Sequence, residues 1–456
     1  LSDASFTDND ATNGGAVYSS SGLTLGANVT FNTVSDSLPN RATNGGALYI
    51  ASGTSNISGS RIEFTENKAD YGGGIYIASG TVNVTGEGIT FSGNLVSEDG
   101  GAIWAGSGSR VNLTGGSLSL SNNQATSGDG GGIYASGNST VTLEATTLSG
   151  NQAEIGRGGA VFMAGGSILN VSGAVSFSGS RADFGGAIYM ANARNSTNLN
   201  ISGTDAVTFT NNDAQTSGGG IYAEANCVIT LEPELTFTGN YARNGNGGAM
   251  WVTDAAQLPE GTVIFSGNHA VKVSSTSTVE GSGGAIYVQG SATSSDLIGP
   301  VRIYSFEGNN TAMSYGGGIC SNSGDITFEG YTGEKAITTV NTAYLGGGLA
   351  ASYTGTMRFN NCTINNQVST RGSGGAVWAK NVVVNSCDFG AEGSPNQSQG
   401  TGNSNGGGAI YSNGSMTLSN ATFSFNEAVQ GGGAVYADTA SVNIRNSRSE
   451  EHTSEL

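Results

Sequence analysis

Apolar and polar residues alternate along most of the chain in short runs of about five residues, which are separated by Gly, Asn, Asp and Ser. Examples are VNVTG (82–86), TVTLE (140–144) and VITLE (228–232). An alternation with period two places successive side chains on opposite faces of an extended strand. No stretch has the spacing of an amphipathic helix. The pattern therefore predicts an all-β protein with many short strands.

Two short phrases repeat through the chain. The first, Gly-Gly-small-aliphatic, occurs in 15 copies with a mean period of about 30 residues and starts at Gly14, Gly45, Gly72, Gly100, Gly130, Gly158, Gly185, Gly218, Gly247, Gly283, Gly316, Gly346, Gly374, Gly407 and Gly432. The second, Phe-x-x-Asn, alternates with it at 6–9, 64–67, 91–94, 209–212, 237–240, 265–268 and 306–309, with Leu replacing Phe at 120–123 and 148–151.

Each period offers three short strands, and three strands per coil repeated in register describe a parallel β-helix. We therefore expect about 15 coils of about 30 residues, which at a strand spacing of about 4.8 Å would extend over roughly 70 Å. A β-propeller fits less well because its blades need four strands and longer repeats.

The alternation also predicts which side chains enter the core. Aliphatic residues follow the Gly pair, as in Leu48 and Ile75, and a second set lies two residues later, as in Ile50 and Ile77. The Phe of the second phrase shares its face with the apolar residue two positions before it, so all these sets are expected inside. The Asn falls at the next corner, where stacked Asn side chains bond to one another and to the turn backbone. The Gly pair permits a tight or positive-φ turn.

One slot between the two inward aliphatic residues is nearly always aromatic, and it contains all three tryptophans. Cys320 and Ala350 are its two exceptions. The slot is expected to point outward or to lie half-covered, as an aromatic ladder along the coils. Such a ladder either stabilises adjacent strands by stacking or forms an exposed strip that contacts a sugar or a partner surface. Its aromatic members are Tyr18, Tyr49, Tyr76, Trp104, Tyr134, Phe162, Tyr189, Tyr222, Trp251, Tyr287, Trp378, Tyr411 and Tyr436.

Charge excludes several kinds of partner. The formal net charge is −18, and only 11% of the 456 residues are charged. Nucleic acids and anionic membranes require stripes of Lys and Arg, so neither is expected as a partner. No run approaches the roughly 18 apolar residues of a transmembrane helix, so we expect no transmembrane segment.

Candidate catalytic and metal-binding residues are scattered. Most of the aspartates considered fall in the loops before the Gly pairs, where turn chemistry accounts for them and weak surface calcium is the alternative: Asp10, Asp70, Asp99, Asp129, Asp183 and Asp213. His269 is expected in a solvated loop. We therefore predict no catalytic residues, no cofactor and no dedicated metal site.

Two of the four cysteines form a candidate pair. Cys362 and Cys387 each precede an inward apolar residue by two positions, in consecutive repeats. In register they would be neighbours about 5 Å apart, which suits either a disulfide or two stacked buried thiols. Cys227 and Cys320 occupy other slots and are expected to be unpaired.

The alternation of GGA(I/L/V) with FxxN over residues 1 to about 446 resembles the repeats of the chlamydial polymorphic outer-membrane proteins and related bacterial autotransporter-like proteins. The resemblance implies a right-handed β-helical passenger at the cell surface, associated with the outer membrane and often adhesive. FSGS (177–180), FEGY (328–331) and FNNC (359–362) lose the Asn of the motif. No catalytic residue carries over, because the motif residues are scaffold in that family.

The ends of the chain give two further expectations. Residues 1–447 read as one β-helix domain that is truncated at both ends, and residues 448–456 (RSEEHTSEL) resemble a translated sequencing adapter. The leading hypothesis is an adhesin-like, non-catalytic scaffold that binds a glycan or protein on a host or neighbouring cell. A polysaccharide lyase or hydrolase of the β-helix type would need carboxylates converging over adjacent coils, whereas a passive stalk would bind nothing.

Overall fold

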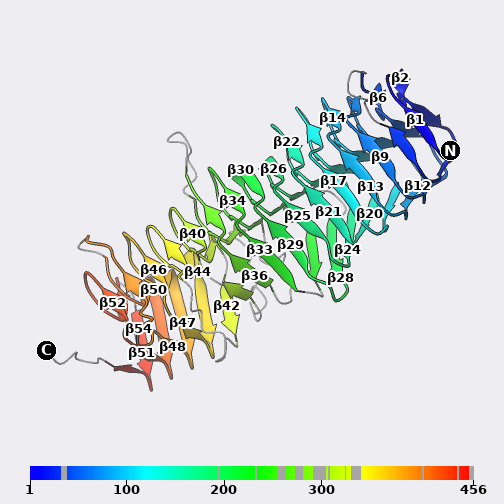
Figure 1. Cartoon of the computed structure of the whole chain (residues 1–456). Coiled ribbons are helices and arrows are strands. Elements are labelled where there is room, and N and C mark those ends of the chain that lie inside the picture. The colour runs from blue at the N-terminus through cyan, green and yellow to red at the C-terminus, as the bar shows by residue number, and fades with distance from the viewer. Residues whose placement is uncertain are drawn as a thin grey trace. The chain divides into compact units, whose positions relative to one another are not determined.

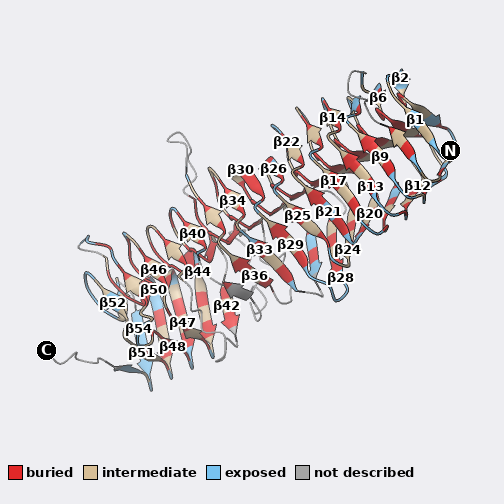
Figure 2. Cartoon of the chain, viewed as in Figure 1, coloured by how far each residue is buried: buried red, intermediate tan, exposed pale blue. Residues whose placement is uncertain are grey.

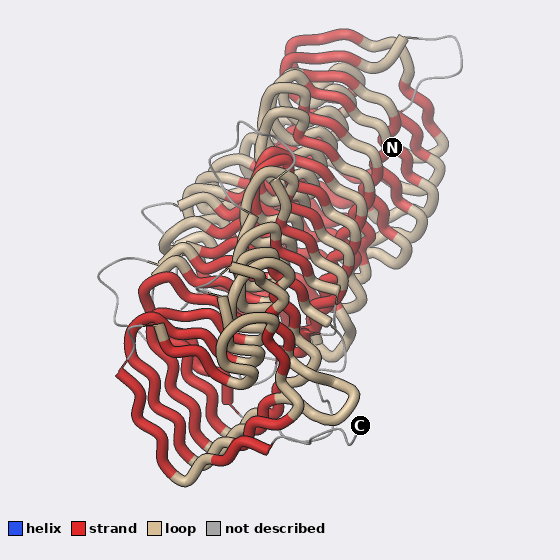
Figure 3. Tube along the Cα trace, turned by 90° about the vertical axis from the view of Figure 1, so that its left-hand side faces the viewer, coloured by secondary structure: helices blue, strands red, loops and turns tan. Residues whose placement is uncertain are grey.

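The computed structural model describes residues 1–31, 38–192, 196–231, 234–253, 263–272, 281–290, 304–306, 309–323, 325–329, 340–402, 405–438 and 441–450. The chain forms a parallel β-solenoid of about 13 turns, slightly fewer than the 15 expected. Two compact units divide it: residues 1–215 with 219–236, and residues 216–218 with 237–456. Strands are the only regular elements in the described part of the chain (Figure 3). Within it, no helix has the length and apolar character to cross a membrane.

In the first unit each coil contributes to four parallel sheets, which adds a short strand to the three predicted (Figure 1). The first sheet follows the Gly pair and contains β3 (Val17–Ser19), β7 (Leu48–Ile50), β11 (Ile75–Ile77), β15 (Ile103–Ala105), β19 (Ile133–Ala135), β23 (Val161–Met163), β27 (Ile188–Met190) and β31 (Ile221–Ala223). The second contains β4 (Thr24–Leu25), β8 (Thr54–Ile57), β12 (Thr81–Val84), β16 (Arg110–Leu113), β20 (Thr140–Glu144), β24 (Ile168–Ser172), β28 (Asn198–Ser202) and β32 (Val228–Leu231).

The third sheet of this unit carries the Phe phrase and contains β1 (Ala4–Phe6), β5 (Val29–Phe31), β9 (Ile62–Thr65), β13 (Ile89–Ser92), β17 (Leu118–Ser121), β21 (Thr146–Ser149), β25 (Ser176–Ser178) and β29 (Val207–Thr210). The fourth follows the Asn corner and contains β2 (Asp10–Asn13), β6 (Arg41–Asn44), β10 (Lys68–Ala69), β14 (Leu95–Val96), β18 (Gln124–Ala125), β22 (Gln152–Ala153) and β26 (Arg181–Phe184). Many of these last strands have only two residues, too few to show a period-two pattern.

The second unit begins with the same arrangement and then merges the first two sheets into longer strands. The first sheet contains β35 (Met250–Val252), β38 (Ile286–Val288), β41 (Ile319–Ser321), β42 (Ile326–Glu329), β44 (Ala350–Asn360), β47 (Val377–Asn385), β50 (Ile410–Ser419), β53 (Val435–Ala437) and β54 (Ser441–Arg445). Short strands after the Asn corner are β34 (Tyr241–Ala242), β37 (His269–Ala270), β40 (Thr311–Ala312), β43 (Thr342–Ala343), β46 (Val368–Ser369), β49 (Gln397–Ser398) and β52 (Glu427–Ala428).

The remaining strands include two that lie at the boundary between the units, β30 (Asp213–Ser217) and β33 (Leu235–Thr238). The second unit also has β36 (Val263–Ser266) and β39 (Tyr304–Phe306), which pair with each other. A separate four-stranded sheet contains β45 (Thr363–Ile364), β48 (Asp388–Phe389), β51 (Thr422–Ser424) and β55 (Arg448–Glu450). Arg448–Glu450 therefore pair with β51, and residues 451–456 lie outside the described residues.

The predicted core faces are confirmed. Strand after strand, buried and half-exposed residues alternate (Figure 2). Equivalent residues stack directly in register, so Phe31, Phe64 and Phe91 form a column with ring centroids 4.8 and 4.6 Å apart. These rings are completely buried, and full burial of each such side chain stabilises the fold by about 2–3 kcal/mol.

A ladder of buried Asn side chains occupies the corner after the Phe sheet, as predicted. Nδ2 of Asn94 donates to Oδ1 of Asn123 at 2.9 Å and to the carbonyl of Phe64 at 2.8 Å. The backbone amide of Asn94 also donates to Asn123 Oδ1, at 3.1 Å. Each asparagine thus satisfies its own side chain and the corner backbone in an interior where unpaired polar groups are costly. The ladder of the first unit runs through Asn9, Asn40, Asn67, Asn94, Asn123 and Asn151.

The structure corrects two positions in the repeat by one residue. In the copy at 306–309 the ladder residue is Asn310, not Asn309, because Asn310 accepts from Asn268 and donates to Asn341. In the copy assigned to Gly346, the positive-φ glycine is Gly347. The run of three glycines allowed either assignment, and the strand register decides between them.

The Gly pair has two separate requirements, which coil 100–101 shows. Gly100 has φ of 71°, a left-handed conformation that is unfavourable for residues with a Cβ. Gly101 needs no positive φ, but a Cβ there would lie 2.0 Å from the carbonyl oxygen of Gly131 on the next coil. The first glycine therefore permits the turn, as predicted, and the second permits close stacking of the coils.

Ser180 interrupts the Asn ladder, as the FSGS departure indicated. Its amide still donates to Asn212 Oδ1 at 3.0 Å, but its own Oγ is buried without a hydrogen-bond partner. Ser180→Asn should restore the side-chain bonds made elsewhere and raise the free energy of unfolding by about 1–2 kcal/mol. Urea unfolding followed by circular dichroism measures the change.

The matched control is Asn94→Ser, which introduces the same interruption into an intact part of the ladder. It removes both Nδ2 hydrogen bonds of Asn94 and the acceptor of Asn67, so unfolding should become easier by about 2–4 kcal/mol. Equal stability of both variants and the parent chain would show that the ladder does not stabilise the coils.

Candidate functional site

The predicted aromatic ladder exists as a continuous column in the first unit, where eight rings stack from Tyr18 to Tyr222. It lies on the first sheet, and each ring sits on the residue paired with it in register. Centroid separations range from 4.2 Å, between Tyr76 and Trp104, to 5.9 Å, between Trp104 and Tyr134. Stacking of this kind contributes to stability beyond the burial of area.

Exposure varies along the column, so the prediction of an outward slot holds for only part of it. Tyr18 is 55% exposed, and the rungs from Tyr49 to Tyr134 are half-buried. Phe162 and Tyr189 are only 3% and 4% exposed. Phe184 packs against this part of the ladder, and the Arg157 guanidinium lies 4.8 Å from the Phe162 ring centroid and 5.0 Å from that of Tyr189. The accessible strip therefore lies toward the N-terminal coils.

The stacking decides which part of each ring a ligand can reach. Tyr49 lies between Tyr18 and Tyr76, each 5.1 Å away and within 7° of parallel. Both faces of an interior ring are thus covered by its neighbours, so only ring edges and hydroxyl groups remain available. Stacking of a sugar on an aromatic face, one version of the ladder hypothesis, has no free face in the interior of the column.

In the second unit the ladder is interrupted. Trp251 and Tyr287 stack at 6.5 Å, and Trp378, Tyr411 and Tyr436 stack at 5.9 and 5.7 Å. Between the two groups the slot contains Cys320 and Ala351. The sequence assignment of Ala350 to this slot was wrong, because Ala350 pairs with the inward residues Ile319 and Val377.

Two tyrosines outside the repeat slot fill this interruption. The Tyr315 ring lies 4.5 Å from that of Trp378, and the Tyr353 ring lies 5.8 Å from Trp378 in an edge-on arrangement. Both pack against the buried cluster of Tyr287, Cys320 and Ala351. Sequence analysis missed them, although aromatic residues beside the two small slots were the available signal.

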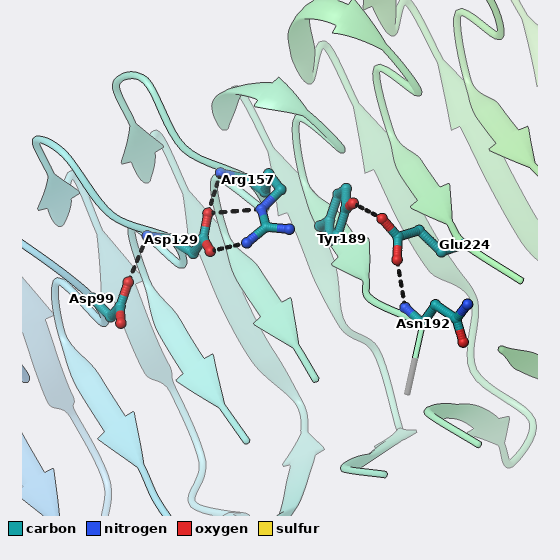
Figure 4. A network of polar contacts seen from close by, with 6 residues as sticks. All are labelled: Asp99, Asp129, Arg157, Tyr189, Asn192 and Glu224. Carbon is teal, nitrogen blue, oxygen red and sulfur yellow. Dashed lines mark hydrogen bonds and ion pairs between the residues drawn. The ribbon is translucent and has the colours of Figure 1, made fainter. Parts of the chain in front are cut away.

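A polar network runs beside the ladder over coils of the first unit (Figure 4). Oδ1 of Asp99 accepts from the amide of Asp129 at 2.9 Å. Both Asp129 oxygens accept from the Arg157 guanidinium, at 3.1 and 2.7 Å. Farther along, the Tyr189 hydroxyl donates to Glu224, whose second oxygen accepts from the amide of Asn192 at 2.6 Å. The network ties neighbouring coils together where the ladder is covered.

Burial perturbs the acid–base properties of this network. The pKa of Asp99 is raised to about 6, mainly by desolvation and also by the charges of Asp129 and Glu98, against the opposing effects of the hydrogen bond from the Asp129 amide and the charge of Arg157. Burial also raises the pKa of Tyr189, and its hydrogen bond to Glu224 acts in the same direction. We therefore expect Asp99 to change charge near pH 6.

The aspartates predicted in loops lie in different parts of the first unit and do not form one cluster among the described residues. Asp99 and Asp129 belong to the network, whereas Asp10, Asp183 and Asp213 lie in strands. Among the described residues, no three His, Cys, Asp or Glu side chains are placed to hold a metal ion.

The placement of His269 in a solvated loop was wrong: it begins β37, lies half-buried and contacts the Thr311 hydroxyl. The two-residue strand gave no detectable sequence pattern.

The candidate cysteine pair occupies a corner of the second unit. Cys362 and Cys387 are both buried and both free thiols, with 2% and 1% exposure. The backbone amide of Cys362 donates to Sγ of Cys387 at 3.3 Å. In the Asn ladder, the backbone amide of Asn94 donates to the side chain of Asn123 in the same way. Cys227 and Cys320 are also buried free thiols.

The in-register coils and their four parallel sheets define a parallel β-helix. In agreement, residues 110–295 match a model described as a right handed beta helix region. Residues 61–78 and 88–106 match the Chlamydia polymorphic membrane protein repeat, so the chain carries repeats similar to those of that family. These matches confirm the resemblance of the GGA(I/L/V) and FxxN phrases. No curated protein and no solved structure matches the chain.

The raised pKa of Asp99 gives a pH-dependent prediction. Because its pKa is about 6 in the folded chain against an ordinary 3.8, the folded state binds this proton more tightly than the unfolded state. The stability that Asp99 contributes is then complete at low pH and is lost as pH rises through about 6. Asp99→Asn keeps an acceptor for the Asp129 amide and abolishes this loss. Its Tm should equal the parent value near pH 4 and exceed it by about 2–4 °C at pH 8.

The control for this measurement is Asp129→Asn, which removes the carboxylate paired with Arg157 and should lower Tm at pH 8. Calorimetry between pH 4 and pH 8 compares the three proteins. A Tm difference between Asp99→Asn and the parent that does not change with pH would rule out titration of Asp99 in this range.

Proposed function

We propose that this chain is a segment of an adhesin-like passenger displayed at the bacterial cell surface, where it acts as a non-catalytic scaffold for binding to a host or neighbouring cell. Support for the location comes from the similarity of residues 61–78 and 88–106 to polymorphic membrane protein repeats. Support for the scaffold role comes from the solenoid, which presents equivalent side chains on successive coils.

The observation that carries the proposal is the accessible part of the aromatic ladder. Tyr18, Tyr49, Tyr76, Trp104 and Tyr134 are consecutive rungs, and each is exposed or half-exposed. Tyr and Trp are enriched at binding surfaces because they combine a large apolar area with a polar group. A row of such groups offers a partner one equivalent contact per coil.

The covered ring faces favour a protein surface over a glycan as the ladder's ligand. Ring edges carry a partial positive charge and therefore prefer carbonyl and carboxylate oxygens or the face of another aromatic ring. Tyrosine hydroxyls add donors along the same strip. A protein surface supplies all these partners, whereas a sugar ring would need a free aromatic face for stacking.

The arrangement of carboxylates supports a non-catalytic role over a β-helix polysaccharide hydrolase or lyase. Asp129 is neutralised by two hydrogen bonds from Arg157, and Asp99 faces the Asp129 backbone. Glycoside hydrolysis needs two carboxyl groups that face the same bond from opposite sides. The contacts of Asp99 and Asp129 serve coil stacking instead.

An adhesion assay tests the proposal. Beads coated with the purified chain are counted on an epithelial cell monolayer after washing. We expect retention by the parent chain and at least a roughly fivefold loss for the triple variant Tyr49→Ala, Tyr76→Ala, Tyr134→Ala, because roughly 1 kcal/mol is lost with the truncated contacts. Alanine is tolerated in this slot at Ala351, so the coils should still form.

Tyr241→Ala is the control, because Tyr241 is a half-buried aromatic residue outside the ladder. Retention that does not depend on the ladder rungs would contradict the role of the strip. No retention above uncoated beads would favour a passive stalk. Release of reducing sugar ends from a polysaccharide panel would favour the enzyme.

A further inference from the structure

A groove crosses the fourth sheet of the first unit, away from the residues of the ladder. Its lining residues come from β2, β6, β10 and β14 and from Thr126 after β18, and its volume is about 520 Å³. The labels β2, β6 and β14 mark its place at the upper edge in Figure 1. Among its lining residues Ala42 is buried and Ala69 is half-buried, so we describe them as its floor. The exposed residues before each alanine, Arg41 and Lys68, form one wall, and those after it, Thr43 and Asp70, form the other. The groove therefore runs across the coils, in the direction in which they stack.

One wall places two cations directly together. Lys68 pairs in register with Arg41 on the preceding coil, so their exposed side chains start about 4.8 Å apart. Like charges opposite each other on a sheet are destabilising. Among the described residues, neither side chain has an ion pair or a hydrogen bond that would offset this repulsion.

Carboxylates lie next to this cation pair at one end and across the groove, whereas Leu95 is the register neighbour at the other end. Asp10 lies opposite Arg41 on the other side, at strand distance but without an ion pair. Asp70 lies two residues after Lys68, on the other wall, and accepts from the Ser97 hydroxyl at 2.8 Å. Thr43 stands beside Asp70 on that wall. In a chain with net charge −18, a site for one anion is thus flanked by carboxylates that would repel further anions.

We propose that this groove binds an extended polysaccharide in which acidic and neutral sugars alternate. One carboxylate of the ligand lies between Arg41 and Lys68 and relieves their repulsion. The neighbouring neutral sugars donate hydroxyl hydrogen bonds to the carboxylates of Asp10 and Asp70, and the Thr43 hydroxyl can donate to or accept from them. A chain with an acid on every sugar would place its next carboxylates against Asp10 and Asp70.

The geometry of the groove agrees with a linear sugar chain. The coil spacing of about 4.8 Å is close to the length of one pyranose unit in an extended chain, so successive sugars would meet successive coils. An extended peptide, at about 3.3 Å per residue, falls out of step with the coils. The site uses none of the ladder rungs, so it does not depend on the proposed adhesive function.

Isothermal titration of the purified chain with a hyaluronan octasaccharide, in which glucuronic acid alternates with a neutral sugar, tests the proposal. We expect the parent chain to bind, and the affinity to fall by about tenfold or more when the ligand carboxyls are reduced to alcohols. The double variant Arg41→Gln, Lys68→Gln should lose affinity for the unmodified ligand to a similar extent. An octamer of galacturonic acid, acidic at every sugar, should bind more weakly than hyaluronan. Loss of the cation pair should leave Tm unchanged or slightly higher.

The matched control is Arg61→Gln, Arg110→Gln, which removes two exposed cations from the same unit and should leave affinity unchanged. Equal binding of the carboxyl-reduced ligand, equal binding by Arg41→Gln, Lys68→Gln, or an equal loss in the control would each overturn the proposal. The triple ladder variant should bind the octasaccharide normally, which separates this result from that of the adhesion assay.

Discussion

In-register stacking of the coils is the constraint on which the rest of the structure depends. Each position lies on its own equivalent in the next coil, so a residue that can bond to a copy of itself satisfies its buried polar side chain at every coil. Asparagine meets this condition because its amide has both a donor and an acceptor. The contacts of Asn67, Asn94 and Asn123 show the result, with every amide bonded to the next and to the backbone.

The same constraint explains why departures from the repeat occur with neighbouring compensations. Cys320 and Ala351 have no aromatic ring to add to the ladder, and the rings of Tyr315 and Tyr353, which lie outside the slot, pack against them instead. Where Asp99 would lie beside Asp129, an arginine on the following coil neutralises the latter. Among the described residues, Arg41 and Lys68 form no ion pair, although Asp10 is in register with Arg41, and this difference distinguishes the groove from the structural networks.

The sequence predicted the parts of the fold that repeat and are long enough to show a period. The inward aliphatics, most of the Phe column, the Asn corner and the aromatic slot followed from alternation and spacing. The assignment of FEGY and FNNC to the second phrase was wrong, because Phe328 and Phe359 pair with each other in the first sheet. Two-residue strands such as Lys68–Ala69 and His269–Ala270 could not be predicted from the sequence, because two positions cannot show an alternation of apolar and polar residues. Runs of three glycines left the register open by one residue, which caused the errors at Gly346 and Ala350.

The candidate site was predictable as a set of residues but not as a surface. Spacing alone places Tyr189 and Tyr49 in equivalent slots, yet Tyr189 is buried and Tyr49 is only half-buried. The difference arises from Arg157 and Phe184, which come from outside the slot and pack on rings of their own coil and of the following coil. Likewise, the groove joins residues whose sequence context is unremarkable until the strands are paired.

The cysteine side chains and the contacts of the coils, most of which join neighbouring coils, also bear on how such a chain folds. Among the described residues no covalent cross-link joins distant segments, since none of the four cysteines forms a disulfide. Each completed coil offers the next an open edge of backbone groups and a row of matching side chains. A chain that emerges progressively from a narrow pore can therefore acquire structure in order, one coil templating the next, and each added coil opposes backward sliding into the pore.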